Sequence, residues 1–198
     1  MTGSQSNEND LIFSLYNDSR TVYRLNDIAM LLGETNFESL NKRLNYFVRT
    51  GKLLNPRKGI YSKTAYNTEE LACRVYTPSY ISLEYVLQKS GVIFQYNSQI
   101  SSVCYLSRSI DIEETTFVYR KIKDEILVDT TGIIRNENGV NIATAERAFL
   151  DLLYLDGEYY FDNLNQINEE LINKLLPIYR SKVLTQRVTQ LLQNDKSK

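Results

Sequence analysis

The side chains best suited to chemistry in this sequence lie between residues 37 and 50. With about 3.6 residues per helical turn, the apolar residues of this segment gather on one arc of a helix, as expected for docking on a core. The polar residues outside that arc are Ser39, Lys42, Arg43, Asn45, Tyr46 and Arg49, with Arg43 nearest the apolar border. Such groups donate hydrogen bonds to phosphates and base edges, so the spacing predicts a helix that reads DNA.

A short hairpin is predicted directly after this helix. The segment NPRKG, residues 55–59, stands between two short apolar stretches, and its Pro and Gly favour a turn. The tip of this wing would place Arg57 and Lys58 against the phosphate backbone. We include Tyr61, in the returning strand, among the expected DNA contacts.

Positive charge is concentrated around these two elements. Between Ser39 and Thr68 there are seven Lys and Arg residues and no Asp or Glu. The rest of the chain contains the other 16 of the 23 Lys and Arg residues and all 24 Asp and Glu residues, so its formal net charge is −8. A local basic stripe on an acidic chain indicates an oriented nucleic-acid surface. The alternative interpretation is an ordinary solvated helix face.

Further elements must hold these residues in place. Apolar residues at 11, 12, 15 and 16 predict an opening helix after a disordered start at residues 1–9. Asn26 is expected to cap a second helix, which ends at Gly33 and is followed by a turn at residues 34–36. Helix, helix, turn, helix and hairpin in this order predict a winged helix-turn-helix domain over residues 1–66.

The remainder, residues 67–198, is expected to form a C-terminal α+β domain. A helix is predicted from Tyr80 to Lys89, and strands at 92–94, 100–106, 115–122 and within 126–134. Helices resume after Thr144, with one near residues 166–176 and a last one opened by Pro177. The predicted fold class is therefore α+β: a winged helix-turn-helix followed by a small, mostly antiparallel sheet and C-terminal helices.

Composition disfavours several function classes. The chain has no His and only two Cys, and it contains neither a GxxxxGK[ST] nor a GxGxxG segment. We therefore expect no enzyme activity, no cofactor and no metal. With no apolar run of membrane-spanning length and a polar N-terminal segment, a cytoplasmic protein without a membrane partner is expected.

Two groups of polar residues in the C-terminal part admit other interpretations. Glu146 and Arg147 are interpreted as a helix-start carboxylate and a solvated or internally paired arginine, with a contact surface or switch as the alternative. A metal-dependent nuclease is the alternative for an acidic cluster, although no Glu-x-Lys pattern accompanies it. This cluster consists of Asp151, Asp156, Glu158 and Asp162.

Three segments together resemble one known family. They are RKGIY at 57–61, PSYISLEYVLQKSGVI at 78–93 and IATAERAFLDLLYL at 142–155. In this order they resemble the AbiEi antitoxins of type IV toxin–antitoxin systems, which act in abortive infection and phage defence. Ala145 stands where the family often has Pro.

The resemblance implies a transcriptional regulator whose winged domain binds operator DNA and represses its own operon. It also implies that the C-terminal domain counters a nucleotidyltransferase-like toxin without needing a stable complex with it. A function of another class stays open: a protein-interaction module that uses the winged domain as a docking surface instead of binding DNA.

Overall fold

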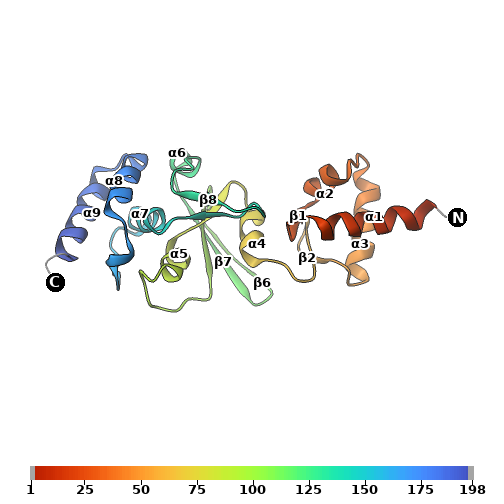
Figure 1. The fold of residues 1–198 in the computed structure, drawn as a ribbon, viewed down its shortest axis with the longest axis horizontal. Coiled ribbons are helices and arrows are strands. Elements are labelled where there is room, and N and C mark those ends of the chain that lie inside the picture. The colour runs from red at the N-terminus through yellow and green to blue at the C-terminus, as the bar shows by residue number, and fades with distance from the viewer. Residues whose placement is uncertain (1–2, 196–198) are drawn as a thin grey trace. The chain divides into compact units, whose positions relative to one another are not determined.

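The computed structural model describes residues 3–195, which form two compact units (Figure 1). The N-terminal unit contains the described residues up to Val75 together with Glu137–Gly139, and the C-terminal unit contains the rest. Helices and strands occur in both, so the fold class is α+β, as predicted.

The N-terminal unit is a winged helix-turn-helix followed by one further helix. Within the described residues its three strands form a sheet in the order β1-β3-β2, with both pairings antiparallel. Its elements are α1 (Gly3–Asn17), β1 (Val22–Arg24), α2 (Leu25–Leu32), α3 (Phe37–Arg49), β2 (Leu54–Arg57), β3 (Ile60–Ser62) and α4 (Thr68–Val75).

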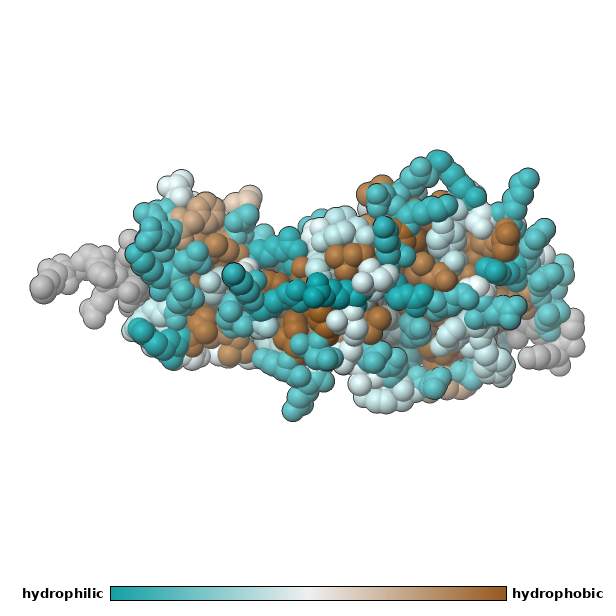
Figure 2. Space-filling view, turned by 180° about the vertical axis from the view of Figure 1, so that it is seen from behind, coloured by the Kyte–Doolittle hydropathy of each residue, from teal (hydrophilic) through white to brown (hydrophobic). Residues whose placement is uncertain are grey.

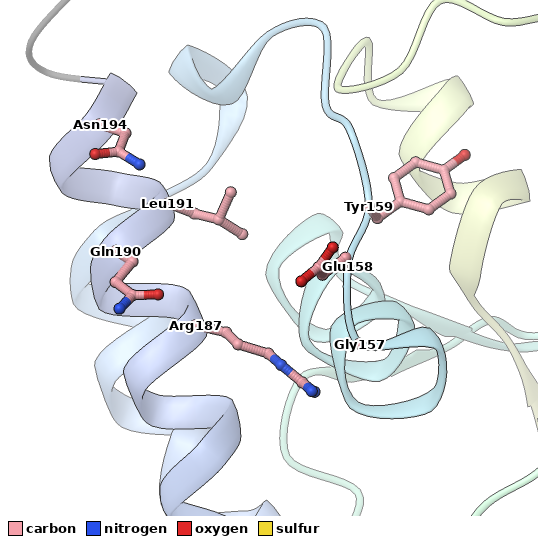
Figure 3. A pocket seen from close by; sticks show the side chains of 7 residues that line it. All are labelled: Gly157, Glu158, Tyr159, Arg187, Gln190, Leu191 and Asn194. Atoms are coloured by element: carbon pink, nitrogen blue, oxygen red, sulfur yellow. The ribbon is translucent and has the colours of Figure 1, made fainter.

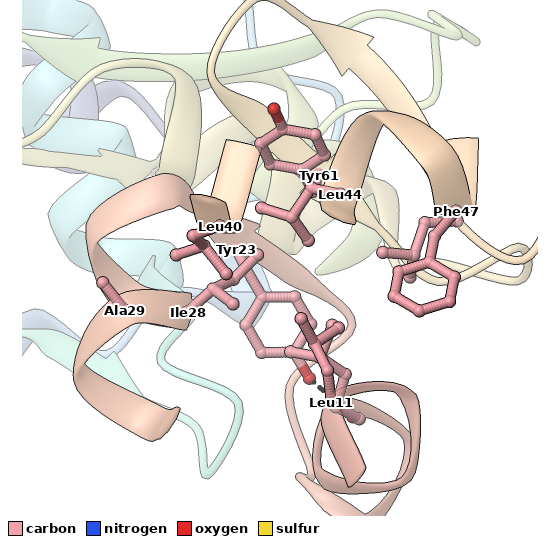
Figure 4. Packing of buried hydrophobic residues seen from close by; sticks show 10 residues of the cluster. Leu11, Tyr23, Ile28, Ala29, Leu40, Leu44, Phe47 and Tyr61 are labelled. Atoms are coloured by element: carbon pink, nitrogen blue, oxygen red, sulfur yellow. Dashed lines mark hydrogen bonds between the residues drawn. The ribbon is translucent and has the colours of Figure 1, made fainter. Parts of the chain in front are cut away.

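The core of this unit brings together α1, β1, α2, α3 and the hairpin (Figure 4). Leu11 and Leu15 from α1 are buried there, which confirms the predicted opening helix. That helix begins at Gly3, so the expectation of disorder is wrong for residues 3–9, while residues 1 and 2 lie outside the described part. Buried side chains from five elements fix the orientation of α3, because burying apolar area is the dominant favourable term in folding.

The helix ends around the turn follow local capping rules. α2 begins two residues earlier than predicted, because Arg24 occupies the N-cap and the Asp27 carboxylate accepts a hydrogen bond from the Arg24 backbone N–H at 2.9 Å. The expectation that Asn26 is the cap is therefore wrong. Gly33, at a φ of 61°, ends α2 as predicted, and the Asn36 side chain caps α3 by accepting from the Ser39 N–H at 3.0 Å.

The helix α4 belongs with the winged unit, beyond the boundary at residue 66 that the sequence predicts. Glu70 on α4 is fully buried, and its carboxylate accepts hydrogen bonds from the backbone N–H groups of Thr21 and Val22. The Thr21 hydroxyl donates to the same carboxylate at 2.6 Å. These bonds fasten α4 to the beginning of β1, a link between residues far apart in the chain that composition does not reveal.

The C-terminal unit is built on a mixed sheet with the strand order β6-β7-β5-β4-β9-β8 among the described residues. Three of its five pairings are antiparallel; β5–β7 and β4–β9 are parallel. The elements are β4 (Ser79–Ile81), α5 (Leu83–Lys89), β5 (Ile100–Cys104), β6 (Arg108–Ile112), β7 (Thr115–Lys121), α6 (Asp124–Leu127), β8 (Ile133–Arg135), β9 (Asn141–Ala143), α7 (Ala145–Asp156), α8 (Glu169–Leu175) and α9 (Lys182–Asp195), with short 3-10 turns η1 (Leu164–Gln166) and η2 (Leu176–Tyr179).

Several predicted elements of this unit differ from the observed ones. The predicted helix from Tyr80 begins only at Leu83, because Tyr80 and Ile81 form an interior strand between β5 and β9. Residues 92–94 form no strand. The strand expected within 126–134 is β8, which begins only at Ile133, after α6 and a loop. Pro177 lies in η2, so the last helix starts at Lys182 instead. For Tyr80 and Ile81, pairing with distant strands outweighs local propensity.

None of the helices within residues 3–195 combines the length and apolar character needed to cross a membrane. On the face displayed in Figure 2, apolar side chains are scattered among hydrophilic ones.

Candidate nucleic-acid interface

The helix α3 is amphipathic and presents a polar face to solvent. Leu40, Leu44 and Phe47 are at most 1% exposed and hold the helix on the core. Consequently the side chains on the remaining arc are exposed, and these are Ser39, Lys42, Asn45, Tyr46 and Arg49. The guanidinium of Arg49 lies 5.7 Å from the centre of the Tyr46 ring, so a cation and an aromatic donor are presented together.

A carboxylate that sequence reasoning left out shares this face. Glu38 accepts a hydrogen bond from the Lys42 ammonium at 2.7 Å, and both side chains are at least 74% exposed. Their spacing of four residues on one helix is the signal that would have revealed the pair. Exposed pairs of this kind are worth at most about 1 kcal/mol, so a phosphate can replace Glu38 as the partner of Lys42.

Arg43 does not belong to the exposed face. Its guanidinium donates to Glu34 at 2.8 Å, and the two side chains are only 18% and 26% exposed. Glu34 also accepts from the backbone N–H of Asn36. Arg43 therefore braces the turn between α2 and α3, whereas the sequence placed it among the DNA contacts.

Tyr61 is a core residue, in contrast to its predicted place among the DNA contacts. It is 5% exposed, and its hydroxyl donates to the Asn41 side chain on α3 at 3.3 Å. Burial raises the pKa of its hydroxyl above the ordinary value. The physical reason is the position of β3, which is paired on both sides in the sheet and faces the helices with this ring.

The wing places Arg57 and Lys58 beside the start of α2. The backbone N–H of Leu25 donates to Gly59 at 3.2 Å, and a small open pocket of about 260 Å³ lies between these segments. Lys58 is exposed, and Arg57 and Asn26 also line the pocket. Because a helix N-terminus and cations both stabilise negative charge, this corner is suited to a phosphate group. Asn26, expected as a cap, is a candidate contact that the sequence missed.

Not every cation of the basic stripe lies on α3 or the wing. The Lys63 ammonium donates to the backbone carbonyls of Asp18 at 2.6 Å and Tyr16 at 3.4 Å, at the end of α1. Lys52 lies 5.5 Å from the centre of the Phe47 ring. The exposed cations best placed for a ligand are therefore Lys42 and Arg49 on α3 and Lys58 on the wing.

The charged residues Arg147 and Asp151 of the C-terminal unit lie in its interior. Arg147 is fully buried and donates to the backbone carbonyls of Ile126 at 2.7 Å and Thr131 at 3.0 Å. This confirms that it is internally paired. Asp151 lies 3.5 Å from the Arg147 guanidinium and accepts hydrogen bonds from three hydroxyls, on Tyr179 at 2.7 Å, Ser82 at 2.8 Å and Tyr80 at 3.2 Å.

The pKa values of this buried group reflect its burial. Loss of hydration raises the pKa of Asp151, because it penalises the carboxylate form more than the surrounding donors stabilise it. Burial by itself would lower the pKa of Arg147. The electrostatic interactions of its guanidinium with Tyr179 and Asp151 are stronger, so the pKa of Arg147 is raised.

Three further acidic residues have separate partners. Glu146 accepts from the backbone N–H of Asn168 at 3.1 Å, Asp156 pairs with Arg120, and Asp162 accepts from the backbone N–H of Phe94. Within residues 3–195 no group of three or more His, Cys, Asp or Glu side chains is arranged to hold a metal ion.

Comparisons with known proteins bear on the fold. The crystal structure of the RV2827C protein from Mycobacterium tuberculosis superposes on this chain with a TM-score of 0.53 at 13% sequence identity, covering 92% of this chain and 75% of that one. At this identity the likeness shows the fold alone. No protein-family model matches the chain, and no curated protein matches it in sequence.

Proposed function

We propose that this protein is a DNA-binding antitoxin that represses its own operon, with the winged unit as the operator-binding part. The observation that carries the DNA-binding part is the exposed polar face of α3, which is held by the buried Leu40, Leu44 and Phe47 and flanked by the cationic wing. The antitoxin part rests on the resemblance of three sequence segments to the AbiEi family.

In this proposal α3 enters the major groove. Lys42 and Arg49 bind phosphates, with Lys42 exchanging Glu38 for a phosphate oxygen. Ser39, Asn45 and Tyr46 lie on the same exposed arc and read base edges. Arg57 and Lys58 on the wing contact the phosphate backbone beside the base-reading helix and contribute affinity without sequence preference.

The partner of the C-terminal unit in this proposal is functional rather than necessarily physical. The antitoxin opposes a nucleotidyltransferase-like toxin in the cytoplasm of a phage-infected cell, as the family resemblance implies. A genetic test is growth rescue: cells that express such a toxin from the neighbouring gene should grow when this protein is co-expressed.

DNA binding is tested with Arg49→Ala, measured by fluorescence anisotropy on the DNA upstream of the coding sequence. Loss of one phosphate contact should lower the slope of log affinity against log salt by about one unit. The matched control is Lys174→Ala, an exposed lysine on α8, which should leave the slope unchanged. Equal slopes for all three proteins would refute the assignment of α3 and favour the winged unit as a protein-docking surface.

A further inference from the structure

The mixed sheet of the C-terminal unit ends in two edge strands, β8 and β6, and β8 is protected against pairing with another strand. It has only three residues. The Thr144 N–H donates to Gly132 at 2.8 Å, so the alternation of an antiparallel ladder turns the backbone of the next residue, Ile133, away from β9. The Ile133 N–H donates instead to Thr130 at 2.9 Å. A short strand with such a local hydrogen bond is a poor template for another chain.

The opposite edge strand, β6, has five residues and exposes unpaired backbone groups. A two-residue turn at 113–114 joins it to β7, so Ile112 and Thr115 form a hydrogen-bonded pair of the ladder. Counting back from this pair, the alternation turns the N–H and C=O groups of Ser109 and Asp111 away from β7. Within residues 3–195 no hydrogen bond reaches these four outward groups, and both side chains are exposed. The edge of β6 is therefore open to pairing with another strand.

The residue pattern of β6 is complementary to itself. When two copies pair antiparallel about a two-fold axis through Ile110, each Ser109 lies opposite Asp111 of the second copy. These outward residues then exchange backbone hydrogen bonds, so all the open groups of both edges are paired. The Asp111 carboxylate accepts from Thr116 through Oδ1 at 2.7 Å, which leaves Oδ2 to accept from the Ser109 hydroxyl of the second copy.

Other symmetric registers are less favourable. An axis through Asp111 would place two carboxylates directly opposite each other, which destabilises a strand pair. An axis through Ser109 would place Asp111 opposite Ser107, which lies before the strand begins. Among the symmetric registers, only the one centred on Ile110 pairs the whole of β6 and keeps its like charges apart.

We propose that β6 binds the β6 strand of a second copy of this chain and forms a two-fold dimer with one continuous sheet. A second copy is the occupant because the order of Ser109, Ile110 and Asp111 matches itself in the antiparallel direction. Five residues span only about 17 Å, so the interface belongs to the small class below about 1,200 Å² and the dimer forms at high protein concentration. The proposal does not depend on operator binding and is measured without DNA.

The test is sedimentation velocity of the full chain at concentrations from about 5 to about 500 μM, where a weak dimer dissociates measurably. Wild type should pass from monomer to dimer as the concentration rises. Ser109→Lys places an ammonium group opposite each Asp111 and should tighten the dimer about threefold or more. Ser109→Asp places carboxylates opposite each other and should weaken it about threefold or more.

The matched controls are Gln190→Lys and Gln190→Asp, which change the net charge in the same way. Gln190 is an exposed residue of α9 (Figure 3), and within the C-terminal unit α9 lies at the end opposite β6 (Figure 1). Both controls should leave the dissociation constant within about twofold of wild type, because surface charges far from the contact are screened by salt.

A further variant, Ser109→Pro, removes one outward N–H from β6. Proline is tolerated on an edge strand where the missing N–H faces outward, so the pairing with β7 should persist. We expect this variant to stay monomeric with an unchanged circular dichroism spectrum. The other edge supplies its control, Arg135→Pro on β8, which should dimerise as wild type does.

Four outcomes contradict the proposal. They are a wild-type monomer at every concentration, charge variants of Ser109 that shift the equilibrium in the same direction, dimerisation of Ser109→Pro, and growth beyond the dimer. The last would mean that β6 pairs with β8 of the next copy in an open, head-to-tail chain. Failure of operator binding alone would leave the dimer in place, so the two proposals fail separately.

Discussion

The cations of α3 and the charged pair Arg147–Asp151 of the C-terminal unit lie in opposite environments. The winged unit exposes Lys42 and Arg49 to solvent over an apolar core, whereas the C-terminal unit encloses Arg147 and Asp151 completely. Exposed charges contribute little to folding and remain available to a ligand. Burying a charge costs free energy because its hydration is lost. A buried charge is therefore found where several hydrogen-bond donors and acceptors stabilise it.

The comparison teaches that charge alone does not indicate a binding site. Arg147 is the more motif-like residue in the sequence, yet its hydrogen bonds all go to the interior of its own unit. Substitutions should therefore separate stability from binding: changes in the C-terminal network should destabilise the fold, and changes on α3 or the wing should weaken only DNA binding.

The largest expected effect comes from Arg147→Met. It leaves Asp151 buried without its cation, and we expect the free energy of unfolding to fall by about 3–5 kcal/mol in urea titration. Arg180→Met is the control, since Arg180 and Glu125 form a pair that is more than 70% exposed and worth about 0–1 kcal/mol. Equal losses in the two variants would remove the distinction between buried and exposed charge.

The second effect tests whether a buried charge also supports the winged unit. Glu70→Ala leaves the backbone N–H groups of Thr21 and Val22 without their acceptor, and we expect a loss of about 2 kcal/mol. Hydrogen exchange at those two amides should become faster than in Glu69→Ala, which changes the neighbouring, partly exposed carboxylate. Unchanged exchange would mean that α4 is fastened to β1 by apolar packing alone.

The third effect concerns the two cations of the wing, the exposed Lys58 and the partly buried Arg57. Arg57→Ala combined with Lys58→Ala should lower operator affinity about tenfold at moderate salt and reduce the salt slope by about two units. Random-sequence DNA should lose as much, because backbone contacts carry no sequence information. Thermal unfolding should shift little. A loss confined to the operator would instead assign base reading to the wing.

The smallest effect depends on pH. Hydrogen bonds from Arg20 lower the pKa of the Asp18 carboxyl below its ordinary value. The ionised carboxylate therefore stabilises the fold above the unfolded pKa of about 4, and this contribution is lost as the pH falls through the lower folded pKa. Asp18→Asn should cost about 0.5–1 kcal/mol at pH 7, and the difference from wild type should shrink below pH 4 in chemical unfolding. Asp10→Asn, at an exposed position on α1, is the control.

The elements that sequence analysis predicted well depend on neighbouring residues. Asn36 and Gly33 set the adjacent ends of α3 and α2, and the apolar spacing of Leu40, Leu44 and Phe47 determines which face of α3 is buried. Capping and helical periodicity act over a few residues, so the winged helix-turn-helix and the exposure of Lys42 and Arg49 followed from the sequence.

What only the tertiary structure decided depends on residues far apart in the chain. Tyr80 lies in an interior strand because β4 pairs with β5 and β9. Tyr61 is buried in the core, and Arg43 forms a salt bridge with Glu34. The sequence by itself determined which segments of the winged unit are amphipathic, where α2 ends and where α3 begins. Pairing partners and side-chain burial were decided by the fold, because their free energies come from desolvation and contacts that form only when distant segments meet.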